Sequence, residues 1–308
     1  MKIFKKIFYL LKFYTMYSNK KRNQNDVIDN YADILVLNPI EQPAVIPKNI
    51  WIYWEGDLPI LVEKCVEQLK KLHPDYEVYF LGPNDLPKFC DIDFDSVLYK
   101  KATPQQRSDL IRFNLLFLHG GIWLDASTIV YERLDWIQSL IEHKRTNCFA
   151  YYRMNNTTNI NYPVVETWLL ASVKDNIFFK LWLEELWRAI ELTPKGYIKH
   201  ITNTEENSEN LFQKIGRLEY LAVYVACQKV MRNYLPSMTL INCDKNAFLY
   251  QVKNKWVKEK ILIDMAVNYA PDDKPKLIKL AGKERKTLSH YYEKGMYFEH
   301  SLLDIPQK

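Results

Sequence analysis

The order of apolar and polar residues along the chain predicts alternating strands and helices. Short apolar runs typical of strands lie at residues 49–54 and 76–81, and a longer run with helical spacing lies between them at 59–73. A second helix is expected at 103–119, where Thr103 is a typical N-cap and a proline follows at the first helical position. With the short apolar run that comes next, this β-α-β-α-β order predicts an α/β fold with a mostly parallel central sheet flanked by helices.

The rest of the chain is expected to be mainly helical. One further strand is predicted near residues 148–152, and helices are predicted at 175–191 and 208–234. The polar segment 193–207 is expected to be a loop, because it contains Thr-Pro-Lys-Gly and Thr-Glu-Glu-Asn. The sequence therefore predicts a helical C-terminal part beside the sheet.

Polar residues interrupt the apolar pattern around the end of the second helix. Asp109 and Arg112 lie three residues apart and share one helix face, Gly120 and Gly121 end the helix, and Asp125 closes the next apolar run. A carboxylate at the end of a buried strand costs free energy unless a cation or a ligand pairs with it. In open α/β sheets this edge is where ligands bind. A plain ion pair within the helix is the alternative, but the spacing to Asp125 favours a site.

Composition is typical of a globular enzyme and excludes some other classes. The 308 residues are 48% hydrophobic and 26% charged, enough for a large core and one or two domains. A net charge of +5 is too small to indicate a nucleic-acid-binding protein, although it suits phosphate-bearing substrates and anionic membranes. The sequence has no P-loop, G-x-G-x-x-G, G-x-S-x-G or H-E-x-x-H pattern. Its five scattered cysteines are expected to be reduced thiols of a cytoplasmic protein.

Residues 1–22 form a basic and apolar leader. Lysines are mixed with Phe, Ile and Leu, the apolar run is too short to span a bilayer, and no small-residue cleavage site follows it. Two interpretations remain open: an amphipathic helix on the inner face of the membrane, or a helix packed on the domain. Residues 23–45 are expected to be a polar connector, which leaves 46–308 as the main domain.

The residues around Asp125 resemble a known family. The run SDLIR at 108–112, followed by GGIWLD at 120–125, is similar to the core of DXD-type sugar-nucleotide glycosyltransferases. The closest group is the capsular polysaccharide synthesis proteins, related to the Och1-like mannosyltransferases and the glucosylating clostridial toxins. The stretch 46–56, which contains Trp54, resembles the first strand of this family. The resemblance covers roughly residues 46–190.

This resemblance implies a GT-A-like nucleotide-sugar-binding fold over residues 46–308. It implies transfer of a hexose from a nucleotide sugar, expected to be a UDP-sugar, to a capsular polysaccharide or a lipid-linked oligosaccharide, with retention of the anomeric configuration. Asp109 and Arg112 are expected to hold sugar hydroxyls, and Asp125 to lie near the ribose, the sugar and a metal ion; these three are the expected catalytic residues. Trp54 is expected to stack on uracil, with core packing as its alternative.

One departure from the family pattern concerns the metal. A second Asp usually follows two residues after the first, and here that position is Ser127, whose hydroxyl is a poor ligand for a hard cation. If Mn²⁺ or Mg²⁺ binds at Asp125 and Ser127, a further ligand is expected from the C-terminal region 276–291. The basic residues of that region could instead hold the donor diphosphate, or form a solvated charge run.

Two other functions stay open at this stage. The missing second Asp is compatible with a catalytically degenerate protein that binds a sugar nucleotide without turnover. A metal-dependent hydrolase is a weaker alternative, since it needs clustered His and Asp ligands. For a transferase, retention by a covalent intermediate needs a carboxylate beside the anomeric carbon, for which Glu166 is a position to check. Attack guided by the departing phosphate is the favoured route.

Overall fold

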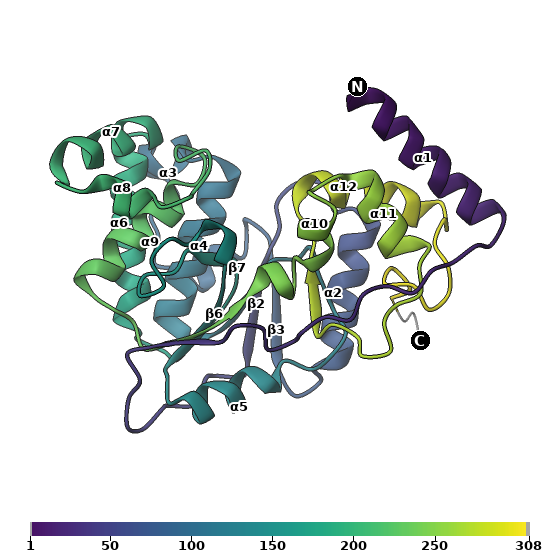
Figure 1. Cartoon of the computed structure of the whole chain (residues 1–308). Coiled ribbons are helices and arrows are strands. Elements are labelled where there is room, and N and C mark those ends of the chain that lie inside the picture. Colours follow the sequence, from purple (N-terminus) through teal and green to yellow (C-terminus); the bar gives the residue numbers. More distant parts are fainter. Residues whose placement is uncertain (1, 306–308) are drawn as a thin grey trace.

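The computed structural model describes residues 2–305, and a seven-stranded mixed sheet lies at its centre (Figure 1). The strands lie in the spatial order β1 (Leu35–Leu37), β8 (Met238–Asn242), β6 (Cys148–Tyr152), β7 (Val165–Ser172), β4 (Gly121–Leu124), β2 (Asn49–Tyr53) and β3 (Glu77–Leu81). The pairs β2–β3, β2–β4 and β6–β8 are parallel, and the pairs β1–β8, β6–β7 and β4–β7 are antiparallel. The predicted α/β class and the strands at 49–54, 76–81 and 148–152 are confirmed.

Helices cover both faces of this sheet. One face packs against α3 (Val97–Lys101), α4 (Pro104–His119), α6 (Ile177–Glu191), α7 (Pro194–Thr204), α8 (Ser208–Phe212) and α9 (Ala222–Asn233). The other face packs against α2 (Ile60–Leu72) and α5 (Asp135–Lys144). In β2, Trp51 and Tyr53 belong to the first core, whereas Ile50 and Ile52 belong to the second. A strand buried on both faces reads as a continuous apolar run, as the sequence of β2 does.

The C-terminal part is helical, as predicted, and forms a third core. It comprises α10 (Leu249–Lys253), α11 (Lys258–Ala266) and α12 (Gly282–Glu293). Before α12 the chain returns to the middle of the molecule, where β9 (Leu277–Lys279) pairs antiparallel with β5 (Thr128–Val130) in a separate two-stranded sheet. β5 begins shortly after β4 ends. The pairing of β9 with β5 therefore places the C-terminal part beside the end of β4.

The predicted loop at 193–207 is wrong, because most of it is the helix α7. Thr193 caps this helix by accepting a hydrogen bond from the Gly196 N–H, and Pro194 takes the first helical position. Tyr197 and Ile201, four residues apart, are both fully buried. Burial of this narrow apolar stripe outweighs the polar composition of the segment.

The single helix predicted at 208–234 is also wrong. The structure divides it into α8 and α9, and the residues between them turn away from helical geometry. Gln213 and Arg217 have positive φ angles of 47° and 51°, which no α-helix accommodates.

The leader contains the helix α1 (Lys2–Ser18), whose two halves differ. Near its end, Phe13 and Met16 are buried in the third core, and the Phe13 ring packs edge-on against Tyr291 of α12. Near its start, Phe4 and Phe8 are 78% and 61% exposed. Figure 1 shows α1 projecting along the edge of the C-terminal part. Among residues 2–305, no helix has both the length and the apolar content needed to cross a bilayer.

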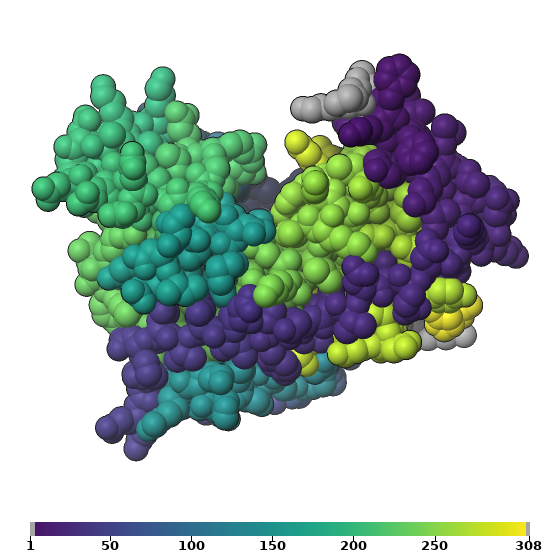
Figure 2. Space-filling view, viewed as in Figure 1, coloured from purple at the N-terminus to yellow at the C-terminus, as the bar shows by residue number. Residues whose placement is uncertain are grey.

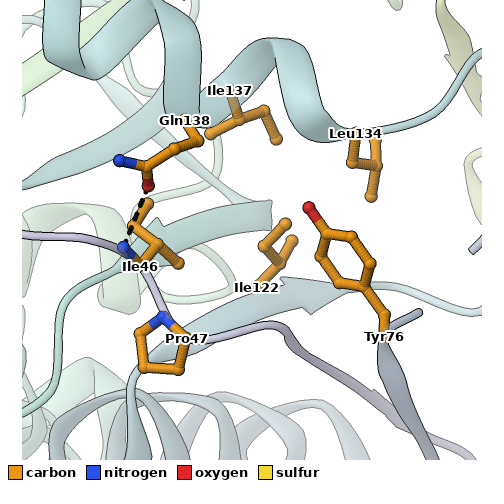
Figure 3. Close-up of a pocket in the computed structure, with 7 residues that line it drawn as sticks. All are labelled: Ile46, Pro47, Tyr76, Ile122, Leu134, Ile137 and Gln138. Atoms are coloured by element: carbon orange, nitrogen blue, oxygen red, sulfur yellow. Dashed lines mark hydrogen bonds between the residues drawn. The ribbon is translucent and has the colours of Figure 1, made fainter.

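The segment between α1 and β2 lies across the molecule, as the purple surface in Figure 2 shows. It contributes β1 to the sheet, so the expected connector at 23–45 is partly structured. Its end packs beside α5 at a very small cavity of about 10 Å³, shown in Figure 3. There the Ile46 N–H donates to Oε1 of Gln138 at 2.9 Å. This cavity is the size of a single water, and neither Asp109, Arg112 nor Asp125 lines it.

Candidate functional site

A glycine turn joins α4 to β4 and sets the position of Asp125. The helix begins with the predicted N-cap: Thr103 accepts from the Gln106 N–H, and the Gln106 side chain accepts from the Thr103 N–H. It ends at Gly120 and Gly121, whose φ angles are 65° and 94°. A Cβ on Gly121 would lie 2.5 Å from the Asn49 carbonyl oxygen. Only glycine fits here, so the Gly-Gly pair lets β4 lie directly beside β2.

The structure brings Asp109, Arg112 and Asp125 together, as the sequence predicts. Nη1 of Arg112 lies 2.7 Å from Oδ1 of Asp109, and its Nη2 lies 3.1 Å from Oδ1 of Asp125. The Arg112 guanidinium also lies on the ring of Trp123, 4.9 Å from the centroid. Asp109 and Arg112 are buried, whereas the Asp125 side chain is 27% exposed. Asp125 is therefore the carboxylate of this group that a ligand can reach.

The two carboxylates differ in their electrostatics. Burial raises the pKa of Asp109 to about 6, because the nearby charge of Asp125 adds to the desolvation and Arg112 only partly offsets both. Burial also acts to raise the pKa of Asp125, but the charges of Lys279 and Arg112 outweigh it and the net shift is downward. Asp125 also accepts a hydrogen bond from Nε1 of Trp123 at 3.0 Å. Asp125 is thus held as an anion.

Lys279 of β9 joins this group from the far end of the chain. Asp109, Arg112, Asp125 and Lys279 are called the Asp125 cluster below. Its Nζ lies 2.9 Å from Oδ2 of Asp125 and donates to Oγ of Ser127 at 2.8 Å. Ser127 in turn donates to the Leu280 carbonyl at 3.1 Å. The Lys279 side chain is only 9% exposed, so its ammonium is held in place between the carboxylate and the hydroxyl.

These contacts do not fit a divalent cation bound by Asp125 and Ser127. Both oxygens of Asp125 already accept from cations, and Lys279 lies where a metal would contact the carboxylate and the hydroxyl together. Mn²⁺ and Mg²⁺ take several oxygen ligands. Within residues 2–305, no group of three or more His, Cys, Asp or Glu side chains is placed to hold a metal.

Trp54 lines a neighbouring cavity of about 330 Å³, the size of small-ligand sites. The guanidinium of Arg285 in α12 lies over the Trp54 ring, 5.0 Å from its centroid. Burial lowers the pKa of Arg285, while the negative charge of Asp125 acts in the opposite direction. Arg285 therefore links this cavity electrostatically to the Asp125 cluster. Trp51 is fully buried in the first core, whereas Trp54 is half-buried against the second core and lines the cavity with its remaining surface.

Glu166 of β7 belongs to a second buried polar group. Its Oε2 accepts from the Tyr224 hydroxyl at 2.8 Å, and its Oε1 lies 3.8 Å from Nη1 of Arg153. Burial raises the pKa of Glu166, although Arg153, Tyr224 and Lys279 act to lower it. The Arg153 Nε contacts Asp244 at 2.6 Å. The charge of Lys279 acts to lower the pKa of both Asp125 and Glu166.

Sequence reasoning identified the region of Lys279 and Arg285 but neither residue. Lys279 lies in Leu-Ile-Lys-Leu, and a lysine inside a short apolar run was the available signal for a buried ion pair. Arg285 lies in a run of charged residues, where nothing in the sequence distinguishes it from its neighbours.

Several known proteins are similar to this chain. The O-glycosyltransferase braB of Annulohypoxylon truncatum is 27% identical over 179 residues, covering 51% of this chain and 42% of that protein. The inositol phosphoceramide mannosyltransferase 3 of Schizosaccharomyces pombe is 33% identical over 101 residues, covering 30% and 28%. The chain thus spans less than half the length of these curated relatives. The solved structure of PaToxG glycosyltransferase superposes with a TM-score of 0.38 at 15% identity, covering 82% of this chain and 87% of that one.

A match to a protein family identifies the chain. The sequence model of the family described as capsular polysaccharide synthesis protein matches residues 4–194. That range is more than half of the 308 residues and contains α4, the Gly-Gly turn and Asp125. The chain belongs to the capsular polysaccharide synthesis protein family.

Proposed function

We propose that this chain is a GT-A-type glycosyltransferase that moves a hexose from a nucleotide sugar, specifically a UDP-sugar, to a saccharide acceptor. The observation that carries the proposal is the contact of Arg112 with both Asp109 and Asp125 at the end of β4. This group combines fixed hydrogen-bond acceptors and donors of the kind that bind sugar hydroxyls. Family membership and relatives named as glycosyltransferases support the same activity.

The residues have separate roles in this proposal. Asp125 accepts hydrogen bonds from donor hydroxyls, and Arg112 fixes the orientation of Asp125 while its own position is fixed by Asp109. Trp54 contacts the base in the cavity beside Arg285. In this proposal the diphosphate lies between Trp54 and Asp125, where nearby cations stabilise the leaving group as its negative charge grows.

The proposed step keeps the anomeric configuration. The bond between the anomeric carbon and the diphosphate oxygen breaks, and its electron pair leaves with the nucleoside diphosphate. An acceptor hydroxyl attacks the same carbon from the same face, and its proton passes to the departing phosphate oxygen. This route needs no carboxylate nucleophile, and Glu166 is already held by Tyr224 and Arg153.

The acceptor proposed is a capsular polysaccharide or a lipid-linked oligosaccharide at the inner face of the membrane. The exposed apolar residues of α1 support this location, because Phe4, Phe8 and Leu11 share one side of the helix. Lys5, Lys6 and Lys12 are exposed on the same helix and would favour an anionic lipid surface. We propose that the enzyme is cytoplasmic and binds the membrane peripherally through α1.

A binding protein without turnover is the second candidate, and Ser127 at the usual second-Asp position is the observation that favours it. One experiment separates the two: UDP- and GDP-sugars are incubated with the full-length protein, and nucleotide release is measured with and without an oligosaccharide acceptor. A transferase releases nucleotide from one donor and forms a larger saccharide. Saturable donor binding without release of nucleotide would instead support the binding protein.

A further inference from the structure

We propose that Lys279 and Arg285 bind the diphosphate of the donor and take the place of the divalent cation of DXD-type enzymes. The inference rests on the proposed function, because it assigns residues to the leaving group of that reaction. The contacts of Asp125 and Ser127 with Lys279 do not fit the metal site that the sequence led us to expect.

Lys279 has the position and the free hydrogen-bonding capacity for this role. An ammonium has three N–H groups, and within residues 2–305 the Lys279 ammonium contacts only Asp125 and Ser127. The third N–H is therefore available to a phosphate oxygen. Lys279 is the more deeply buried partner of this pair, and Asp125 is the carboxylate that solvent reaches. A fixed ammonium there supplies positive charge in a poorly solvated place, where it stabilises an anion strongly.

Arg285 extends this positive charge toward the base cavity. Its guanidinium lies on the Trp54 ring, and its Nε is buried without a hydrogen-bond partner among residues 2–305. A buried N–H without a partner is costly, and a ligand oxygen would satisfy it. A guanidinium that lies on an aromatic ring and is within electrostatic range of Asp125 is suited to contact a diphosphate that joins a nucleoside to a sugar.

The charges of the cluster are consistent with this assignment. Asp109 and Asp125 are paired with Arg112 and Lys279, and Arg285 adds a cation with no carboxylate within ion-pair distance among the described residues. The buried carboxylate of Glu284 also acts on Arg285 and Lys279, so these charges are close to balanced. A donor diphosphate would give Arg285 the hydrogen-bonded anion that it lacks among residues 2–305. A divalent cation would instead have to displace Lys279 from both of its partners.

Nucleotide binding in a chelator tests the inference on the unmodified protein. Isothermal calorimetry with UDP, GDP and uridine is performed on the full-length chain, first with EDTA and then with added Mn²⁺. We expect UDP or GDP to bind in EDTA, and donor turnover to continue there. If EDTA abolishes diphosphate binding and turnover and Mn²⁺ restores both, the inference is overturned while the proposed function survives. If neither diphosphate binds under any condition and no donor turns over, the proposed function fails as well.

Substitutions then test the residues. Lys279→Met should weaken binding of the diphosphate about tenfold and leave uridine binding unchanged, because only the phosphates contact the ammonium. Lys279→Arg, which keeps the charge, should retain more of the affinity for the diphosphate than Lys279→Met. Arg285→Gln should weaken diphosphate binding by a factor similar to that of Lys279→Met. Lys195→Met, on the exposed surface of α7, is the matched control and should change nothing. Equal loss of UDP and uridine affinity in Lys279→Met would mean a purely structural role for Lys279 and would overturn its assignment.

Discussion

Nζ of Lys279 lies 2.9 Å from Oδ2 of Asp125, and this contact joins the C-terminal part of the chain to the end of β4. The pairing of β9 with β5 fixes it, since Lys279 is opposite Thr128, which directly follows Ser127. The site is thus built from two distant segments. Residues 4–194, which match the family, supply Asp109, Arg112 and Asp125, whereas Lys279 lies outside that range.

Replacing Asp125 with Asn should remove transfer without unfolding the protein. The substitution keeps the shape of the side chain but removes the charge that Arg112 and Lys279 contact. Loss of one preorganised electrostatic contact of this kind lowers kcat by about 10²–10³. Turnover of the best donor and thermal unfolding are the measurements.

Asp95→Asn is the control for that variant, because Asp95 is an exposed surface carboxylate paired only with Lys100 among the described residues. It should keep full activity. Near-normal turnover by Asp125→Asn would remove Asp125 from the reaction, and unfolding of this variant alone would show that the carboxylate serves mainly the fold.

Replacing Arg112 with Lys should destabilise the protein even though the charge is kept. Arg112 contacts Asp109 through one terminal nitrogen and Asp125 through the other, and an ammonium cannot reproduce this fork. A buried carboxylate left without its partner costs about 3–5 kcal/mol. Chemical denaturation measures the free energy of unfolding.

Arg133→Lys is the matched control for this variant. Arg133 also bridges two carboxylates, those of Asp75 and Asp135, but on the surface. Exposed pairs contribute about 0–1 kcal/mol, so this variant should stay close to the wild-type stability. Similar losses in the two variants would mean that burial of Arg112 is not what makes its contacts important.

The sequence was sufficient for the helix, turn and strand around Asp125, because each depends on local chemistry. The Thr103 cap, the Gly-Gly turn and the spacing of Asp109 and Arg112 leave few alternatives. It was insufficient for β7 and for Lys279. All eight residues of β7 are buried, so it lacks the alternation that marks a half-exposed strand. Lys279 reaches Asp125 only through β5–β9 pairing, which no local pattern specifies.

The raised pKa of Asp109 predicts a pH-dependent stability. The pKa rises from an ordinary value of 3.8 to about 6 in the folded protein, so the folded state binds more protons than the unfolded state between these values. The contribution of Asp109 to the free energy of unfolding therefore falls by about 1–3 kcal/mol as the pH rises from about 4 to 6. Denaturant unfolding of Asp109→Asn and wild type should show that the variant lacks this part of the decline. If the free energy of unfolding of the two proteins changed in parallel over this pH range, the pKa of Asp109 would be near its ordinary value.

Replacing Gly121 with Ala should disturb both the fold and the site. The residue has a φ of 94°, and its Cβ would lie 2.5 Å from the Asn49 carbonyl oxygen. The strained backbone and the clash together should cost about 2–4 kcal/mol. Gly216→Ala is the control, because its Cβ would meet nothing within 4 Å, and it should change the free energy of unfolding by less than about 1 kcal/mol. Unfolding curves that coincide for the two variants would contradict the need for glycine at the turn.

Substitutions on α1 test the proposed membrane contact without disturbing the core. Deleting residues 1–22 is unsuitable, because Phe13 and Met16 are buried in the third core. The combined change Phe4→Ser, Phe8→Ser and Leu11→Ser affects only exposed side chains. Each is worth up to about 1.5–3 kcal/mol when buried in lipid, so binding to anionic vesicles should weaken at least about tenfold.

Vesicle sedimentation at low and high salt is the measurement. Salt should weaken binding of the wild-type protein, because the exposed lysines of α1 contribute electrostatic attraction that salt screens. The matched control replaces three exposed apolar residues elsewhere, Val45, Val97 and Ile160, with Ser and should bind vesicles normally. Turnover of a soluble acceptor should be unchanged in both variants, since α1 lies apart from Asp125. Equal vesicle binding by the α1 variant and the wild type would show that the leader only packs on the C-terminal part.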